Sequence, residues 1–135
     1  MNQLRNHATC INHVNAVKDA LYTLNGKWKL LVVAALYDGP RRFNDIKQEV
    51  EGITPRVLTK ELRDLELNAF VERKIEEGAI TKITYSLTPY SSSLRNIISA
   101  LVEFGNAHKH YLQQKYKTEK EGKKKPVYEA IGDRD

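Results

Sequence analysis

Apolar residues recur at helical spacing early in the chain. Four of them, three or four residues apart, share one face of a predicted helix: Val14, Val17, Leu21 and Leu24. Asn25-Gly26 ends this helix, because both residues tolerate the left-handed conformation that closes helices. Residues 27–37 are apolar almost all round, so we expect a second helix at the buried centre of the domain.

A short third helix is expected after a turn at residues 38–40. Residues 41–43 are extended, and Asn44 is the expected N-cap of a helix that reaches about residue 50. An asparagine side chain at the N-cap accepts a hydrogen bond from the first turn of the helix.

A longer fourth helix is predicted over residues 54–67, after a tight turn. The Thr54 hydroxyl can cap this helix, and Pro55 stands at the first helical position, where its missing N–H costs nothing. Three leucines share its inward face: Leu58, Leu62 and Leu65.

The second half of the chain predicts a β-hairpin and a long helix. Residues 70–76 and 82–87 have strand-like content, and Gly78 lies in the bend between them. The last helix is expected from residues 91–93 to about Gln114, on the order of 35 Å in length. Its first seam is Leu94, Ile98, Leu101, Gly105, His108 and Leu112, and its second seam is Ile97, Phe104 and Tyr111. One seam can cover the helix's own domain, and the other requires a further partner.

This order of elements is typical of a winged helix-turn-helix, a mainly α fold with a small β-hairpin (α+β). With the leucines of the fourth helix inward, its opposite face presents Arg56, Thr59, Lys60 and Arg63. Arg56 suits bidentate contact with guanine, and Thr59 suits a hydrogen bond or a thymine methyl. Lys60 and Arg63 lie further along and are expected on phosphates. A solvated charged helix face is the alternative, which the helix order makes less favoured.

Two further places are expected near DNA phosphates. The helix N-terminus around Thr54 and Pro55 offers backbone N–H groups to a phosphate. Lys82 on the hairpin is a candidate contact, although Glu76 and Glu77 beside it would repel phosphate. A hairpin that only closes the fold is an equal alternative.

Several motifs together resemble the HxlR-type winged helix-turn-helix regulators, over Leu21 to about Leu112. They are Gly26-Lys27-Trp28, Arg42-Phe43-Asn44, Ile53-Thr54-Pro55-Arg56 with Leu58-Thr59, and Tyr85-Ser86-Leu87-Thr88-Pro89. The resemblance implies a homodimer, built from the first and last helices, that binds an inverted repeat near promoters. It also implies that residues 54–63 are the recognition helix and that Arg42 and Asn44 lie near the DNA backbone. On this basis we expect a DNA-binding domain with its dimerisation helices over residues 1–115. Residues 116–135 would be a charged, mobile tail.

Three positions depart from the pattern of this family. Asn68-Ala69 stands where a glycine usually ends the recognition helix, so we expect Asn68 to supply the left-handed cap. The hairpin turn lacks the usual prolines. Cys10 lies five residues before Asn15, which occupies the position of the usual family cysteine.

The amino-acid composition restricts the class of protein but does not identify a function. A chain of 135 residues with 29% charged residues suits one globular domain, and its net charge of +5 is compatible with an anionic partner. A solvated basic surface is the alternative. One cysteine excludes an internal disulfide, and the N-terminus lacks the apolar core of a signal peptide, so we expect a cytoplasmic protein. The most apolar stretch, residues 28–37, is too short to span a bilayer.

Cys10 is a candidate redox sensor, because some relatives of this type respond to oxidants through an N-terminal thiol. His13 lies three residues further on, where an imidazolium would favour the thiolate. An inert, half-buried cysteine is the favoured alternative. His7, Cys10 and His13 do not converge on one helix face, so we expect no metal and no other cofactor.

The sequence therefore predicts a homodimeric, sequence-specific regulator of transcription that binds double-stranded DNA, a repressor rather than an activator. We expect no enzyme, since the chain lacks a Gly-rich phosphate loop, a nucleophile elbow and a carboxylate pair with a companion base. One alternative is a winged-helix protein-interaction module without sequence-specific DNA binding. Another is a regulator that also senses a small-molecule or oxidant effector.

Overall fold

The structure is a computed structural model that describes residues 2–119, with side chains from Asn12 onward. Its elements are α1 (Asn2–Thr23), α2 (Lys29–Ala35), β1 (Arg41–Arg42), α3 (Phe43–Glu49), α4 (Pro55–Leu67), β2 (Val71–Glu76), β3 (Lys82–Leu87), a 3-10 turn η1 (Pro89–Ser91) and α5 (Ser92–Thr118). The chain divides after Ser92 into two compact units, and each is described by itself. The segment expected to be a tail lies outside the described residues from residue 120 onward.

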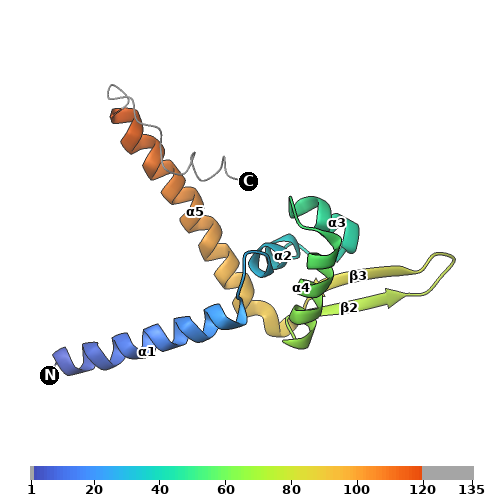
Figure 1. Ribbon diagram of the computed structural model, residues 1–135, viewed down its shortest axis with the longest axis horizontal. Helices are drawn as coiled ribbons and strands as arrows, with labels where there is room; N and C mark the ends of the chain where they lie inside the picture. The colour runs from blue at the N-terminus through green and yellow to red at the C-terminus, as the bar shows by residue number, and fades with distance from the viewer. Residues whose placement is uncertain (1, 120–135) are drawn as a thin grey trace. The chain divides into compact units, whose positions relative to one another are not determined.

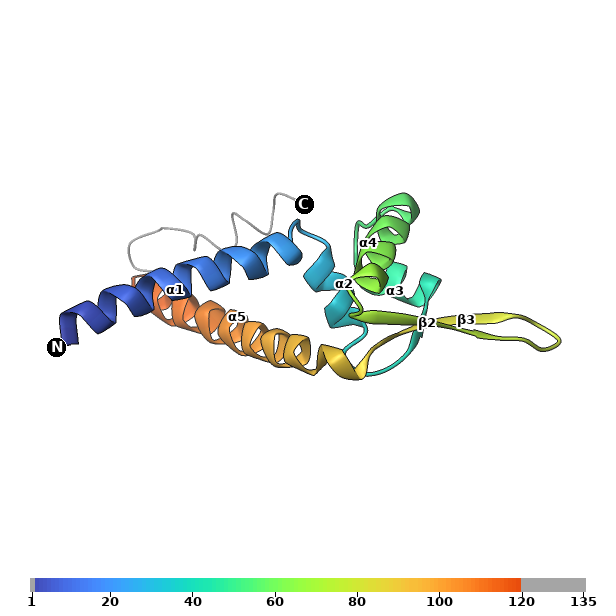
Figure 2. The same ribbon diagram turned by 90° about the horizontal axis from the view of Figure 1, so that it is seen from below.

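A small antiparallel sheet supports the three short helices. Its strand order is β1-β3-β2, and Arg41 pairs with Tyr85 while Val71 pairs with Leu87. In Figures 1 and 2, α2, α3 and α4 gather at one end of the β2–β3 hairpin, which extends beyond them. The predicted fold class, helices with a small β-hairpin, is confirmed, with β1 as a third strand at the sheet edge.

The core lies between α2, α3, α4 and the root of the hairpin. Its most deeply buried apolar side chains are Val32, Val33, Leu36, Ile46, Leu58, Leu62 and Leu65. The three leucines of α4 therefore face inward, as their spacing predicts. The expectation that the second helix is buried all round holds on one side only, because Leu31 is 44% exposed and Ala34 is exposed.

The turn between α3 and α4 and the start of α4 follow from local chemistry. Gly52 has a φ of +88°, a conformation that a side chain would strain. Thr54 is the N-cap of α4, and its Oγ1 accepts a hydrogen bond from the Val57 N–H at 3.2 Å. The predicted Thr54-Pro55 helix start is therefore confirmed.

The predicted N-cap of α3 is wrong. Arg42 is the extended N-cap residue, and Asn44 lies inside the first turn of the helix. The helix starts early because the Asp45 carboxylate accepts a hydrogen bond from the Arg42 backbone N–H at 3.4 Å. An acidic residue in a first turn also interacts well with the helix dipole.

The left-handed residue that ends α4 is Ala69 rather than Asn68, so that prediction is also wrong. Asn68 has a φ of −86°, whereas Ala69 has a φ of 63°. The Ala69 N–H donates to Glu66 O at 3.0 Å, and the Phe70 N–H donates to Leu65 O at 2.9 Å. These two bonds form a Schellman motif, which requires positive φ at the residue after the cap. Asn68 instead uses its side-chain amide, which donates to Asp64 O at 2.8 Å.

The two long helices carry much exposed apolar surface. On α1, Val14, Val17 and Leu21 are 56–61% exposed. On α5, burial is confined to Leu94 and Ile98 near its start, and the second seam is exposed throughout. The first seam is thus buried only over its first two members. Among the described residues, no helix combines the length and the apolar character needed to cross a membrane.

Replacing Ala69 with Gly is expected to raise the free energy of unfolding by about 1 kcal/mol, because glycine adopts positive φ without strain. Urea unfolding followed by circular dichroism measures the change. Ala100→Gly, at an exposed interior position of α5, is the control and should destabilise by about 1 kcal/mol. A loss of stability in Ala69→Gly would contradict the strain assigned to Ala69.

Candidate nucleic-acid interface

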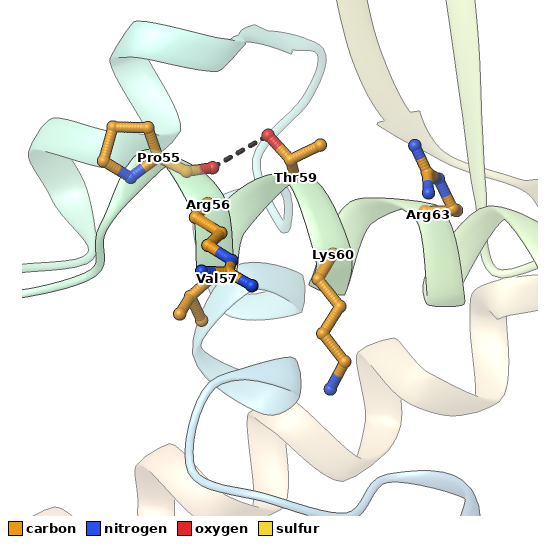
Figure 3. Close-up of a pocket in the computed structure, with 6 residues that line it drawn as sticks. All are labelled: Pro55, Arg56, Val57, Thr59, Lys60 and Arg63. Atoms are coloured by element: carbon orange, nitrogen blue, oxygen red, sulfur yellow. Dashed lines mark hydrogen bonds between the residues drawn. The ribbon is translucent and has the colours of Figure 1, made fainter.

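The outer face of α4 forms a shallow hollow. It is lined by Pro55, Arg56, Val57, Thr59, Lys60 and Arg63. All of these except Val57 are exposed, whereas the leucines on the opposite side of the helix are buried. In Figure 3, Arg56 and Lys60 extend to the same side of α4, and Arg63 points away from them. Five predicted contact residues, Pro55, Arg56, Thr59, Lys60 and Arg63, thus line this hollow, although their side chains do not all point the same way.

The side chains of this face differ in how freely they can meet a ligand. Within the part of the chain that the structure describes, no ion pair or hydrogen bond engages the side chains of Arg56 and Arg63. Lys60 Nζ lies 3.9 Å from Glu61 Oε1, at the limit of an ion pair. The Thr59 hydroxyl donates to Pro55 O at 2.8 Å, drawn as the dashed line in Figure 3. Its methyl group is therefore the part of Thr59 best able to face outward.

The other predicted contact residues lie on different elements. Arg42 and Asn44 are exposed, at the end of β1 and the start of α3. Their neighbour Arg41 is anchored, because its Nε donates to Ala35 O at 2.9 Å and lies 3.3 Å from Glu49 Oε2. That anchor fixes the backbone next to Arg42.

On the hairpin, Lys82 lies near both a carboxylate and another cation. Lys82 begins β3, is exposed, and pairs in register with Glu76. Lys74 Nζ lies 3.7 Å from Glu76 Oε1. On the other face of the hairpin, Ile75 and Ile83 pair across the strands and are 51% and 39% exposed. Cation and carboxylate thus alternate here, unlike on the outer face of α4.

Cys10 lies on α1, in the part of that helix whose side chains are outside the description. His7 belongs to the same segment. Among the residues whose side chains are described, no group of three or more His, Cys, Asp or Glu could hold a metal ion.

The cations of α4 share one stripe of the helix, which is flanked by the partly exposed Asp64 and Glu66, whereas Glu61 is buried. The helix carries three cations, Arg56, Lys60 and Arg63, and three carboxylates, Glu61, Asp64 and Glu66. Each carboxylate has a cationic partner from outside the helix. Lys29 of α2 pairs with Glu61 and Asp64, and Arg73 of β2 pairs with Glu66 at 3.6 Å. The outer face therefore keeps its positive charge although the helix as a whole carries equal numbers of both signs.

The Lys29 ammonium is the buried centre of this arrangement. Lys29 is 5% exposed and Glu61 is 6% exposed. Lys29 Nζ lies 2.9 Å from Glu61 Oε2 and 3.3 Å from Asp64 Oδ2, and it donates to Asn25 Oδ1 at 3.4 Å. The contact with Glu61 is an ion pair, and Glu61 Oε2 has no hydrogen-bond partner among the described residues. Burial lowers the pKa of Lys29, but the Glu61 and Asp64 carboxylates outweigh it, so that its pKa is raised above the usual value.

Sequence reasoning missed this cluster, although two signals for it are present. Glu61 falls on the inward stripe of α4, between Leu58 and Leu62, where a charge needs a partner. Lys29 interrupts an otherwise apolar helix. Each signal alone is ambiguous, and only the packing of α2 against α4 brings the two charges together.

The helix order, the hairpin and the cationic face of α4 define a winged helix-turn-helix protein of the DNA-binding, transcription-regulating class. Residues 23–115 match the family described as HxlR-like helix-turn-helix, and the chain belongs to that family. An uncharacterised HTH-type transcriptional regulator of Methanothermobacter thermautotrophicus is 36% identical over 93 residues, which are 69% of this chain and 71% of the relative.

Solved structures agree with this assignment. The redox regulator HypR in its reduced form superimposes with a TM-score of 0.66 and 32% identity, over 73% of this chain and 98% of HypR. A protein of Enterococcus faecalis V583, described as a transcriptional regulator of the MarR family, superimposes with a TM-score of 0.63 and 33% identity. That match covers 76% of this chain and 91% of the other. The resemblance noted in the sequence is therefore confirmed.

Replacing Lys29 with Met is expected to lower the free energy of unfolding by about 3–5 kcal/mol, because the buried Glu61 carboxylate loses its counter-charge. Because the folded-state pKa of Lys29 is raised, its contribution is fully present below the unfolded value of about 10.4. The contribution is lost as the pH rises through the folded value. Urea unfolding from neutral to alkaline pH measures both effects.

Lys47→Met, at an exposed position of α3, is the matched control and should change stability by less than about 0.5 kcal/mol. The difference between the unchanged protein and Lys29→Met should shrink only above the unfolded pKa. A difference that grows with alkaline pH would contradict the ion-pair role of Lys29.

Proposed function

We propose that this protein is a sequence-specific regulator of transcription that binds double-stranded DNA as a homodimer on an inverted repeat and acts as a repressor. One observation carries the proposal: α4 buries Leu58, Leu62 and Leu65 and leaves Arg56, Lys60 and Arg63 exposed on its outer face. A helix of this kind in a helix-turn-helix enters the major groove with its N-terminal residues toward the bases. Membership of the HxlR-like family supports the same function.

Roles on α4 follow from chemistry and position. Arg56 is exposed in the first turn, is held by no other described residue, and suits bidentate contact with guanine. Thr59 would meet a thymine methyl with its own methyl group, since its hydroxyl already donates to Pro55 O. Lys60 and Arg63 lie further along and would contact phosphates. The helix N-terminus at Thr54 and Pro55 would receive a phosphate.

Contacts outside α4 are proposed for the DNA backbone. Arg42 and Asn44 are exposed next to the anchored Arg41 and would contact phosphates on one side of the groove. Lys82 would contact phosphate from the hairpin, with a smaller contribution, because Glu76 faces it across the strands. The affinity should fall with added salt as these cations displace counterions.

Homodimerisation is proposed through α1 and α5. Both helices expose large apolar side chains, including Val14, Val17 and Leu21 on α1 and Phe104 and Tyr111 on α5. Apolar surface of this extent is favourably buried against another copy. A dimer would also carry two recognition helices, which match half-sites about 34 Å apart.

Selection of bound fragments from random duplex DNA tests the proposed function. The expected result is an enriched inverted repeat, bound more weakly as the salt concentration rises. No enrichment, with binding that depends on salt alone, would favour the alternative of a protein-interaction module. A reporter placed downstream of the enriched site then separates repression from activation.

Replacing Arg56 with Ala is expected to weaken binding to the selected site by about 1–3 kcal/mol and to relax the base preference at one position. Replacing Lys60 with Ala should weaken binding to all sequences alike, because a phosphate contact carries no sequence information. Fluorescence anisotropy on the selected duplex and a random duplex measures both changes. Equal losses on the two duplexes for both variants would overturn these roles.

Replacing Phe104 with Lys is expected to convert the dimer to monomers and to weaken binding to the inverted repeat by at least about 10-fold. Asn106→Lys adds the same charge two residues further along the exposed part of α5 and is the matched control. Sedimentation equilibrium measures the oligomeric state. A Phe104→Lys protein that stays dimeric would exclude this position from the interface.

An oxidant effector acting through Cys10 is proposed because HypR, to which this chain is similar, is a redox regulator with reduced and oxidised structures. Cys10 is the one cysteine of the chain, so a thiol oxidant has a single target of this type. Diamide should lower the DNA affinity of the unchanged protein and leave Cys10→Ser unaffected, as measured by gel shift. An equal loss in both proteins would exclude a sensing role for Cys10.

A further inference from the structure

The buried ammonium of Lys29, a residue of α2, contacts two other parts of the chain. It contacts Asn25 in the link between α1 and α2, and it contacts Glu61 and Asp64 of α4. Lys29 itself belongs to α2, which packs against α4. The Lys29 ammonium therefore connects two segments: the link between α1 and α2, and α4, the helix with the exposed cationic face.

The position of these contacts around α4 bears on how that helix is oriented. At about 100° per residue, Glu61 lies roughly 160° around the helix from Thr59. Asp64 lies about 40° from Lys60, so Lys29 holds α4 along a flank that runs from the buried side toward the edge of the outer face. Two carboxylates one turn apart, Glu61 and Asp64, meet the same ammonium at 2.9 and 3.3 Å. A rotation or a slide of α4 would lengthen at least one of these contacts.

The other contacts on the inward face of α4 are apolar, and they restrict the orientation of the helix less. Leu58, Leu62 and Leu65 fill the interface, and apolar packing tolerates small rearrangements of its side chains better than a buried charge tolerates loss of its partner. Glu61 Oε2 has no hydrogen-bond partner among the described residues besides its ion-pair contact with Lys29. A shift of α4 that broke this contact would therefore leave a buried charge without its partner, whereas the leucines could repack.

We propose that Lys29 is a positioning residue for base recognition: with Glu61 and Asp64 it fixes the rotation of α4 about its axis, and so the presentation of Arg56 and Thr59 to the bases. The inference rests on the proposed DNA-binding function and deepens it. Lys29 contacts no base. Its effect reaches the DNA through the orientation of α4, so its loss should reduce discrimination between sequences more than affinity for DNA in general.

The test compares binding to the selected duplex with binding to a scrambled duplex of the same composition. The full-length chain is used, at a temperature where each variant is folded by circular dichroism. Lys29→Met should reduce the ratio of the two affinities by about 10-fold, which is the scale of one misplaced base contact. The altered net charge affects both duplexes alike and cancels in this ratio. Lys29→Arg keeps the charge and should keep the ratio within about twofold.

Leu87→Ala is the control: it should lower the stability of the domain but leave the contacts of Lys29 with Glu61 and Asp64 in place. Leu87 is buried on β3, and its truncation should destabilise the domain by a comparable amount. Its affinity ratio is expected to stay unchanged. An unchanged ratio in Lys29→Met, or an equal fall in Leu87→Ala, would overturn the positioning role.

If Lys29→Met does not fold, Glu61→Gln tests the positioning role instead. This variant keeps the size of the side chain and removes its charge, so the ratio should again fall. An unchanged ratio in folded Glu61→Gln would overturn the proposal while leaving the proposed function intact. If the unchanged protein prefers no duplex over another, the proposed function itself fails, and the positioning role fails with it.

Discussion

The ammonium of Lys29, buried between α2 and α4, is the counter-charge of two of the three carboxylates of α4. If the ammonium were absent, the buried Glu61 carboxylate would lose its counter-charge, and the partly exposed Asp64 would lose the same partner. The third, Glu66, is paired by Arg73 of β2. Glu61 is buried, and Asp64 and Glu66 are paired with Lys29 and Arg73. Arg56 and Arg63 have no ion-pair or hydrogen-bond partner among the described residues. A helix with balanced charge thereby acquires one strongly cationic side.

The two ends of α4 show how its position along the chain is set. Thr54 and Pro55 define the start, and a Schellman motif with Ala69 in the left-handed conformation defines the end. The residues just after that motif are tied to the chain that leaves the hairpin: the Thr88 hydroxyl donates to Ala69 O at 2.7 Å, and the Thr88 N–H donates to Phe70 O at 3.0 Å. The Schellman hydrogen bonds require the left-handed conformation of Ala69, and the two hydrogen bonds of Thr88 then join the residues after α4 to the chain that leaves β3.

Most of the fold could be predicted because its signals are local. Helical spacing identified the leucines of α4, and a threonine followed by proline identified its start. Two cap assignments failed because competing residues stood one or two positions away: Asp45 accepts the Arg42 N–H, and the Schellman hydrogen bonds select Ala69 over Asn68. The Lys29 cluster could not be derived, since it depends on a contact between residues 32 and 35 positions apart. Periodicity finds faces of helices, but it does not say which charge on one face meets which charge on another.

Exposed apolar side chains and exposed cations are concentrated on different helices of the chain. Nine of the fifteen large apolar side chains exposed among the described residues belong to α1 and α5, and only Leu67 belongs to α4. A helix that meets DNA needs cations and few apolar groups, whereas a helix that meets another copy needs the reverse. The two kinds of surface therefore occupy different elements of the chain. Asn25, in the link that follows α1, contacts the Lys29 ammonium, which also contacts Glu61 and Asp64, so one charged group connects this link to α4.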